Sequence, residues 1–334
     1  MRAMLLEFPG PIAGKPLKMV DLPPPAPGPG QVLVQVSVCG LCHTDLHTVE
    51  GELALPQLPV IPGHQVVGRV AELAPGVKGL KVGERVGLAW LGRTCGSCSF
   101  CQTGRENLCP EARFTGLHLD GGYAEQVAAY ADFVYSLPAG LPDEAAAPLL
   151  CAGIIGYRAL RRSDIKPGGR LGLIGFGASA HLAIQVARYW DCRVYVFTRS
   201  PGHRQLAQEL GAAWAGQISD PPPTLLDSAI IFAPAGALVP EALKLLERGG
   251  TLALAGIYMS AIPSLDYEKH LYFEKTVRSV TASTRRDGRE LLELAAKIPL
   301  VTQTVPFPLE EANRALGLLK AGQIDGAGVL LVGR

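Results

Sequence analysis

Four cysteines lie within one short stretch of the sequence, CGSCSFCQTGRENLC, at positions 95, 98, 101 and 109. Four thiolates at the spacing Cys-x2-Cys-x2-Cys-x7-Cys can surround one tetrahedral zinc, and four protein ligands leave no coordination position open for chemistry. The stretch therefore predicts a structural zinc site formed by Cys95, Cys98, Cys101 and Cys109. An iron–sulfur cluster is the rival interpretation; ferredoxins with a similar pattern place only three residues before the fourth cysteine, whereas seven intervene here.

A second reactive stretch, SVCGLCHTDLHTVEG, spans residues 37–51 and holds two cysteines, two histidines and an aspartate within nine residues. A Cys-x-x-Cys pair on its own permits a metal site, a redox pair or a plain turn. The chain has eight cysteines and shows no secretory signal, which favours metal binding or catalysis over disulfides because the cytosol keeps thiols reduced.

The segment RLGLIGFGASAHLAIQVAR reads as an apolar strand, a glycine-rich turn and an amphipathic helix. Gly175 would permit the tight turn, Gly177 would let the backbone approach a pyrophosphate, and Ala180 stands where a small residue lets helix and strand pack closely. The phosphates would rest on the helix N-terminus, at Ala178, Ser179 and Ala180. This succession predicts dinucleotide binding.

The end of the next strand, in RVYVFTRSPGHR, indicates which dinucleotide binds. An NAD site carries an acidic residue about 20 positions after the glycines. Thr198 occupies that region, followed by Arg199, Ser200 and, slightly later, Arg204. A hydroxyl and a guanidinium suit a 2′-phosphate, so the sequence favours NADP over NAD. The alternative is that both arginines are ordinary solvated residues.

Two domains are expected to position these residues. Residues 1–150 contain short β-branched runs separated by Gly- and Pro-rich turns, which predict an antiparallel, barrel-like β domain. Residues 151–284 alternate apolar runs with helical segments, which predicts a buried parallel sheet. Residues 285–334 are too few for a domain of their own and are expected to complete the first domain.

The bulk composition excludes several classes of partner. The chain of 334 residues has 31 basic and 30 acidic residues, a formal charge of +1, and no basic run. Nucleic acid and anionic membranes are therefore not expected partners. No window of about 18 apolar residues occurs, and a cytoplasmic protein is expected.

The motifs CGLCHTDLH, IPGHQVVGRV, CGSCSFCQTGRENLC, LLCAGIIGYRAL and GFGASAHL occur in that order. In this the chain resembles the medium-chain zinc-dependent alcohol dehydrogenases, particularly the bacterial branch near the cinnamyl-alcohol-type enzymes, over essentially its whole length. The resemblance implies a GroES-like β domain and a Rossmann-like, doubly wound α/β domain. It also implies an alcohol dehydrogenase or aldehyde reductase that transfers hydride between a zinc-bound, primary alcohol and NAD(P).

The resemblance further implies a catalytic zinc held by Cys42, His64 and Cys151, with the fourth position left for water or substrate oxygen. Two thiolates and one imidazole are a known catalytic ligand set. Together with the four-cysteine site this makes two zincs per chain. Cys39, the first cysteine of its pair, is then expected to be structural.

By the same resemblance, Thr44 contacts the substrate oxygen and passes a proton toward His47, a residue type that exchanges protons readily near neutral pH. Asp45 accepts a hydrogen bond from His64 and fixes its tautomer. His43 faces the cofactor pyrophosphate.

One departure from the family stands next to a zinc ligand: many relatives read Gly-His-Glu where this chain reads Gly63-His64-Gln65. The neutral amide cannot bring negative charge toward the zinc, and no catalytic role is expected for Gln65. Family members are dimers or tetramers joined through a sheet edge, for which GGTLALAGI, residues 249–257, is the candidate here. Two alternative functions are a zinc-free quinone-reductase-type oxidoreductase and a non-catalytic zinc- and nucleotide-binding redox sensor.

Overall fold

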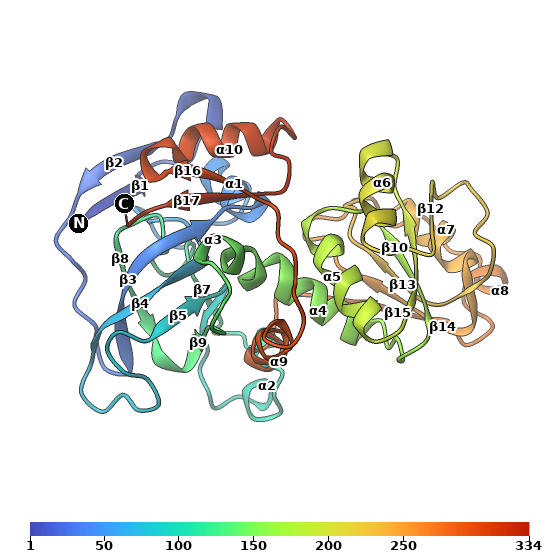
Figure 1. Ribbon diagram of the computed structural model, residues 1–334, viewed down its shortest axis with the longest axis horizontal. Helices are drawn as coiled ribbons and strands as arrows, with labels where there is room; N and C mark the ends of the chain where they lie inside the picture. Colours follow the sequence, from blue (N-terminus) through green and yellow to red (C-terminus); the bar gives the residue numbers. More distant parts are fainter. Residues whose placement is uncertain (334) are drawn as a thin grey trace. The chain divides into compact units, whose positions relative to one another are not determined.

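The computed structural model describes residues 1–333 and divides them into two compact units (Figure 1). Unit 1 comprises Met1–Cys151 together with the described residues from Ala282 onward, and unit 2 comprises Ala152–Thr281. The expected boundaries differ at two points. Cys151 lies in unit 1, because it follows the 3-10 turn Ala147–Leu150 and its sulfur meets that of Cys42. Residues 282–284 also lie in unit 1, since Thr284 caps the helix that begins at Arg285.

Unit 1 is rich in β-structure. Its strands are β1 (Arg2–Leu6), β2 (Leu17–Asp21), β3 (Gln31–Gly40), β4 (Gln65–Leu73), β5 (Arg85–Leu88), β6 (Leu91–Arg93), β7 (Arg113–Phe114), β8 (Gln126–Tyr130), β9 (Val134–Ser136), β16 (Thr304–Pro308) and β17 (Ala327–Leu331). Its helices are α1 (His43–Glu50), α2 (Ser99–Gln102), α3 (Asp143–Ala146), α9 (Arg285–Ala295) and α10 (Ala312–Lys320).

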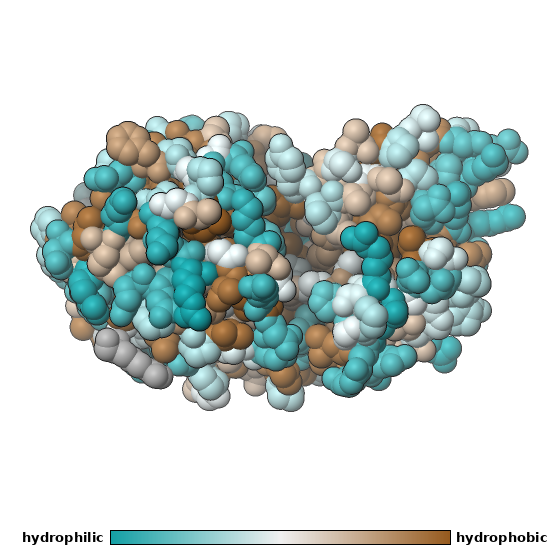
Figure 2. Space-filling model, turned by 90° about the horizontal axis from the view of Figure 1, so that it is seen from above, coloured by the Kyte–Doolittle hydropathy of each residue, from teal (hydrophilic) through white to brown (hydrophobic). Residues whose placement is uncertain are grey.

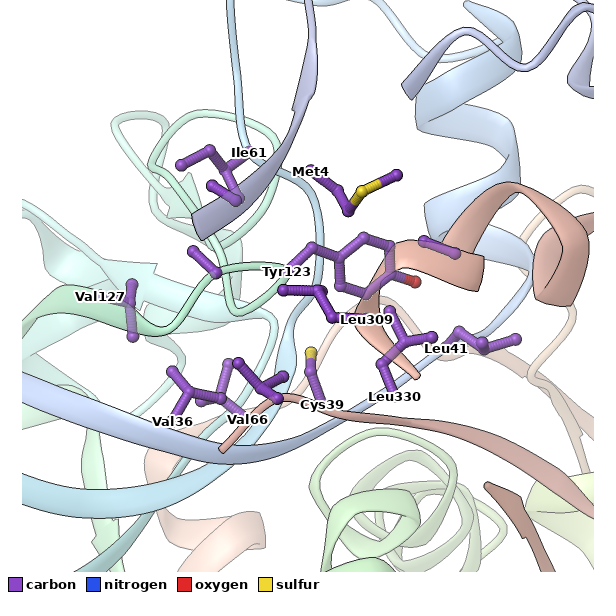
Figure 3. Close-up of a cluster of buried hydrophobic side chains, with 14 of the residues drawn as sticks. Met4, Val36, Cys39, Leu41, Ile61, Val66, Tyr123, Val127, Leu309 and Leu330 are labelled. Carbon is purple, nitrogen blue, oxygen red and sulfur yellow. The ribbon is translucent and has the colours of Figure 1, made fainter. Parts of the chain in front are cut away.

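The largest sheet of unit 1 runs in the order β16-β17-β3-β4-β5-β9, with β8 also paired to β3. All of its pairs are antiparallel except β16 with β17. The C-terminal segment thus completes the sheet, because β17 pairs directly with the central strand β3. The apolar residues of β3 and β4 contribute to one buried core, in which Tyr123, Met4, Leu41 and Cys39 lie together (Figure 3).

Unit 2 is a parallel α/β structure. Its strands are β10 (Arg170–Ile174), β11 (Arg193–Phe197), β12 (Trp214–Gly216), β13 (Leu226–Ile231), β14 (Leu246–Leu254) and β15 (Thr276–Ser279), in the sheet order β12-β11-β10-β13-β14-β15. Its helices are α4 (Ala152–Arg162), α5 (Ala178–Tyr189), α6 (Pro201–Glu209), α7 (Leu238–Lys244) and α8 (Tyr267–His270). This strand order is that of a doubly wound, Rossmann-like sheet.

The sheet order corrects one expectation about assembly. The segment 249–257 overlaps β14, which lies between β13 and β15 and therefore has partners on both sides. The edges of the sheet are β12 and β15. The sequence analysis took residues 249–257 as the edge strand because they are strongly apolar. That composition is instead typical of an inner strand such as β14, which is buried on both faces.

The surface mixes polarities. On the face drawn in Figure 2, hydrophilic and hydrophobic residues are interspersed in both units. Within residues 1–333, no helix is long and apolar enough to cross a membrane.

Candidate functional site

Three donors far apart in the sequence meet in unit 1. Cys42 stands at the N-cap of α1, His64 directly precedes β4, and Cys151 ends the 3-10 turn before α4. The Cys42 sulfur lies 3.5 Å from Nε2 of His64 and 3.9 Å from the sulfur of Cys151. The three donor atoms lie within 4.8 Å of one another. The structure therefore brings the predicted ligand set together.

These separations fit a tetrahedral zinc. Zinc–sulfur bonds of about 2.3 Å and zinc–nitrogen bonds of about 2.0 Å at tetrahedral angles place two sulfurs about 3.8 Å apart and a sulfur and nitrogen about 3.5 Å apart. The Cys42–Cys151 and Cys42–His64 distances, 3.9 Å and 3.5 Å, match both values. Three protein donors leave one position of the tetrahedron for a further ligand.

Asp45 ties two of these donors to one carboxylate. Its Oδ1 accepts from Nδ1 of His64 at 2.9 Å, and its Oδ2 accepts from the backbone N–H of Cys42 at 2.9 Å. Because Nδ1 is engaged, Nε2 of His64 is directed at the sulfur of Cys42. The second bond is half of a capping box, in which the Cys42 sulfur also accepts from the backbone N–H of Thr44. This motif starts α1, a helix that the sequence analysis did not predict, although Asp45 at the third helical position signals it.

Burial and charge shape the titration of this group of donors. Hydrogen bonding from Cys151 lowers the pKa of Cys42 well below its usual range, and the same bond raises the pKa of Cys151. Burial opposes a charged His64, but Asp45 and Cys42 outweigh it and raise the pKa of His64 to about 10. Burial raises the pKa of Asp45. Of the two cysteines, Cys42 is therefore favoured as the thiolate, even before a bound cation neutralises its negative charge.

Cys39 takes no part in this group. It is fully buried in the core of unit 1 beside Tyr123 (Figure 3), and burial raises the pKa of its thiol well above the usual range. Gly63 explains how His64 can stand so close to that core: its φ is +99°, and a Cβ there would lie 2.4 Å from the Tyr123 ring and 2.9 Å from the Cys39 sulfur. Only glycine fits that turn.

The four-cysteine lobe, residues 95–109, forms the second group of donors. The sulfur of Cys95 lies 3.9 Å from that of Cys101 and 3.5 Å from that of Cys109, and Cys98 and Cys101 are 3.6 Å apart. These sulfur–sulfur distances lie near the separation of about 3.8 Å that is expected between two sulfurs bound to one tetrahedral zinc. Backbone N–H groups of Cys98 and Ser97 lower the pKa of Cys95 to about 6, whereas burial raises the pKa of Cys109 to about 11.

Helix α1 carries the expected proton-transfer residues. Thr44 is buried, His47 follows three positions later on the same side of the helix, and the His47 ring pairs with the carboxylate of Glu52. His43 is exposed, with its ring 6.3 Å from that of His47. Gln65 is buried against Gly40, and its Nε2 has no hydrogen-bond partner among the described residues.

The glycine turn has the predicted strand–turn–helix form in unit 2. It joins β10 to α5, Gly175 has a φ of +85°, and Gly177 caps the helix. Ala178 is exposed, Ser179 half-buried and Ala180 fully buried. The first turn of α5 therefore offers backbone N–H donors next to two glycines, and the Phe176 side chain between them is buried, so the approach of a pyrophosphate to the backbone is not blocked by it.

The residues after β11 form the cap of α6. Ser200 is its N-cap and accepts from the backbone N–H of His203, while Arg199 is exposed. Arg204 donates from Nη1 to the carbonyls of Thr198 and Arg199, both at 3.0 Å. One function of Arg204 is therefore to hold this loop in place.

Family models and curated relatives show which proteins the chain is similar to. Residues 28–139 match the family model of the alcohol dehydrogenase GroES-like domain, and residues 178–297 match that of the zinc-binding dehydrogenases. A probable alcohol dehydrogenase, AdhA, of Mycobacterium tuberculosis is 50% identical over 337 residues, covering 99% of this chain and 97% of the relative.

The chain is also similar to solved structures. A cinnamyl alcohol dehydrogenase of Sorghum bicolor superposes with a TM-score of 0.89 at 28% identity, over 99% of this chain and 97% of its own. The structure of CAD from Helicobacter pylori, complexed with NADP(H), superposes with a TM-score of 0.88 at 26% identity, over 100% of this chain and 99% of its own.

The zinc-free reductase and the redox sensor are not favoured, since relatives and family models name alcohol and zinc-binding dehydrogenases. The chain belongs to the medium-chain family of zinc-dependent alcohol dehydrogenases and is a nicotinamide-linked oxidoreductase of small-molecule alcohols.

Proposed function

We propose that each chain holds two zinc ions, a catalytic one at Cys42, His64 and Cys151 and a structural one at Cys95, Cys98, Cys101 and Cys109. The observation that carries this proposal is the match of both groups of donors to tetrahedral spacings, with three donors in one group and four in the other. Three donors leave a position for substrate, whereas four leave none.

A zinc ion at the three-donor site would act as a Lewis acid that stabilises negative charge on the oxygen of an alcohol. Asp45 supports this site by holding Nδ1 of His64 protonated, so that Nε2 keeps its lone pair toward the metal. The carboxylate also increases the basicity of the imidazole. Gln65 has no part in this scheme, because its amide carries no charge.

We assign proton transfer to Thr44 and His47. Thr44 lies in the first turn of α1, with its backbone N–H bonded to the Cys42 sulfur, and its side-chain hydrogen bond to the same sulfur helps to lower the pKa of Cys42. His47 lies one turn further on, and its side chain is 23% exposed, which gives it access to bulk water. Glu52 pairs with Nδ1 of the imidazole and fixes the orientation of the ring.

We assign the pyrophosphate of the cofactor to the turn from Gly175 to Ala180, and on the family resemblance we also assign His43 a contact with the cofactor. The adenosine end would meet Thr198, Arg199, Ser200 and Arg204. No acidic side chain stands among these four, which favours NADP because its 2′-phosphate carries negative charge. The hydroxyl oxygen of Ser200 accepts the N-cap hydrogen bond from His203, but its O–H remains a donor for a phosphate oxygen.

The substrate is proposed to be a primary alcohol or the corresponding aldehyde, and the chain is proposed to act in the cytoplasm as a homodimer or homotetramer. Of the two sheet edges in unit 2, β15 and β12, either offers unpaired backbone groups to a second copy.

The test combines metal analysis with steady-state kinetics. The purified protein is expected to contain about two zinc atoms per chain and to oxidise primary aliphatic or aromatic alcohols faster with NADP than with NAD. A preparation active without zinc would contradict the metal assignment. A strong preference for NAD would contradict only the roles of Thr198, Arg199, Ser200 and Arg204.

A further inference from the structure

Strands β6 and β7 form a neck that joins the four-cysteine lobe to the rest of unit 1 and leads to His64; the lobe also contacts α9, where Glu106 accepts from the backbone N–H of Arg285 at 2.9 Å. Strands β6 and β7 enter and leave the lobe and pair with each other, with Leu91 opposite Phe114 and Arg93 opposite Arg113. At the lobe end of the neck, the backbone N–H of Cys95 donates to the Cys109 sulfur at 3.5 Å. At the other end, the N–H of Thr115 donates to the carbonyl of Trp90 at 2.9 Å.

Aromatic rings continue this neck to the catalytic group of donors. Phe114 stacks on Trp90 with ring centroids 4.9 Å apart and planes 11° from parallel. Trp90 meets the His64 ring edge to face, with centroids 5.0 Å apart. His118 packs against the outer side of this stack, with its ring centroid 5.4 Å from that of Phe114. Such ring pairs have preferred geometries, so they restrict the orientation of the imidazole.

The chain that leaves the lobe also fixes the backbone just before His64. A Cβ at Gly116 would lie 2.7 Å from the backbone nitrogen of Gly63, and one at Gly121 would lie 2.0 Å from its carbonyl oxygen. The N–H of Gly122 donates to that same carbonyl at 2.9 Å. The neck therefore holds both the ring of His64 and the residue that precedes it.

We propose that the four-cysteine lobe positions His64 for metal binding, with Trp90 and Phe114 as positioning residues. The lobe anchors β6 and β7, and these strands hold the rings and the turn that set the direction of Nε2. Asp45 fixes the same imidazole from Nδ1, so the lobe and Asp45 restrain it through different contacts. The inference rests on the proposed function, because it takes Cys42, His64 and Cys151 as donors to the catalytic metal.

A merely space-filling role for these rings predicts something different. If Trp90 and Phe114 only lined the substrate site, their loss would change KM for bulky alcohols and leave the metal unaffected. A positioning role changes the metal itself, because altered support of a metal-binding histidine weakens its bond to the ion.

The experiment compares Phe114→Leu with Phe114→Tyr and Phe307→Leu in the metal-loaded full chain. Phe114→Tyr retains the stacked ring. Phe307 lies in β16, in the core of unit 1, and is more buried than Phe114, so its loss measures general destabilisation. Two readouts are taken: the rate of zinc release to a chromophoric chelator, and the visible absorption bands of protein with cobalt in place of the catalytic zinc. The release phase of the catalytic zinc is the one missing from Cys42→Ala.

In Phe114→Leu the catalytic zinc is expected to leave about tenfold faster, with shifted cobalt bands, while the other two variants resemble the wild type. An unchanged rate and spectrum in Phe114→Leu, or an equal change in Phe307→Leu, would overturn the positioning role alone. If the wild type shows no release phase that Cys42→Ala removes, the catalytic metal assignment fails, and this inference fails with it.

Discussion

The two groups of cysteine donors in unit 1 differ in how the chain builds them. The four-cysteine lobe takes its donors from 15 consecutive residues, and all but Cys109 are half-buried. The catalytic group takes one donor each from the start of α1, the start of β4 and the end of a 3-10 turn, and His64 is almost fully buried. The first can form as a local loop, whereas the second requires the folded sheet.

This contrast separates what each site contributes. A local site with four donors has no free position, so its free energy of metal binding goes into holding the loop and its neck. A site assembled from distant elements binds its metal only as tightly as the surrounding fold places the donors. With three donors it also keeps one coordination position for chemistry. Substitutions at the two sites test this division, through metal content and turnover at one and through stability at the other.

The largest effect is expected from Cys42→Ala. It removes one of three donors, so the chain should lose one metal per molecule and turnover should fall by about 10³-fold, the equivalent of roughly 4 kcal/mol of stabilisation in the transition state. Metal content and alcohol-dependent NAD(P) reduction provide the measurement.

Cys39→Ala is the matched control, three residues earlier in the chain. Cys39 lies in the apolar core, so this variant should lose stability by about 1 kcal/mol and keep both metals and most of its activity. Loss of a metal from Cys39→Ala would mean that the wrong cysteine of the pair has been assigned.

Cys98→Ala tests the other side of the comparison. Removing a donor from the lobe should lower the free energy of unfolding by about 3 kcal/mol or more, because structural metal binding contributes directly to folding. Turnover at low temperature should fall far less than in Cys42→Ala. Thermal unfolding and metal analysis check this, and an unchanged unfolding temperature would remove the distinction between the two sites.

Asp45→Asn probes the support of the catalytic donors. The amide can still accept from His64 but offers an N–H to the backbone N–H of Cys42, so the capping-box bond is lost along with the negative charge. We expect the zinc affinity to fall between about tenfold and 100-fold, measured by competition with a chelator.

Asp287→Asn provides the control for this effect. Asp287 fills the same third position in the capping box of α9 and is equally buried, but its capping partner is Thr284, which is not one of the proposed metal donors. It should cost stability without changing the zinc affinity. If both variants weaken zinc binding equally, the effect of Asp45 is only that of a helix cap.

The same contrast governs what the sequence reveals. The lobe is readable from spacing alone, because its ligands are neighbours in the chain. The parallel sheet of unit 2 is readable from its apolar runs, and the glycine turn from its place between strand and helix. Cys42, His64 and Cys151 cannot be joined by spacing, because the contact among them arises from the pairing of β3 with β4 and the packing of the turn before Cys151. Family resemblance was needed to connect them.

Other features had no sequence signal strong enough to use. The neck from the lobe to His64 depends on ring contacts between Trp90 and Phe114, which are 24 residues apart and look like ordinary apolar positions. Helix α1 is short and polar on average, so its hydrophobic periodicity is weak, and only the capping box marks its start. The edge strand of unit 2 was misjudged because inner strands are the more apolar ones.

The smallest effect concerns pH and the support of α1. Glu50 ends this helix, accepts from Lys320 of α10 at 2.7 Å and from the N–H of Ile12 at 2.9 Å, and these contacts lower its pKa. A carboxylate with a lowered pKa stabilises the fold fully above its unfolded value of about 4.5 and loses this contribution as the pH falls through the folded value. Glu50→Gln should therefore lower the unfolding temperature by the equivalent of about 1 kcal/mol or less at pH 7, and the difference from the wild type should shrink as the pH falls below about 4.5 and vanish once the pH is below the folded pKa of Glu50. A difference that persists at low pH would mean that Glu50 supports α1 by packing instead of charge. The expected loss is far smaller than for either metal site, because α1 is held mainly by its cap at Cys42 and by its buried face.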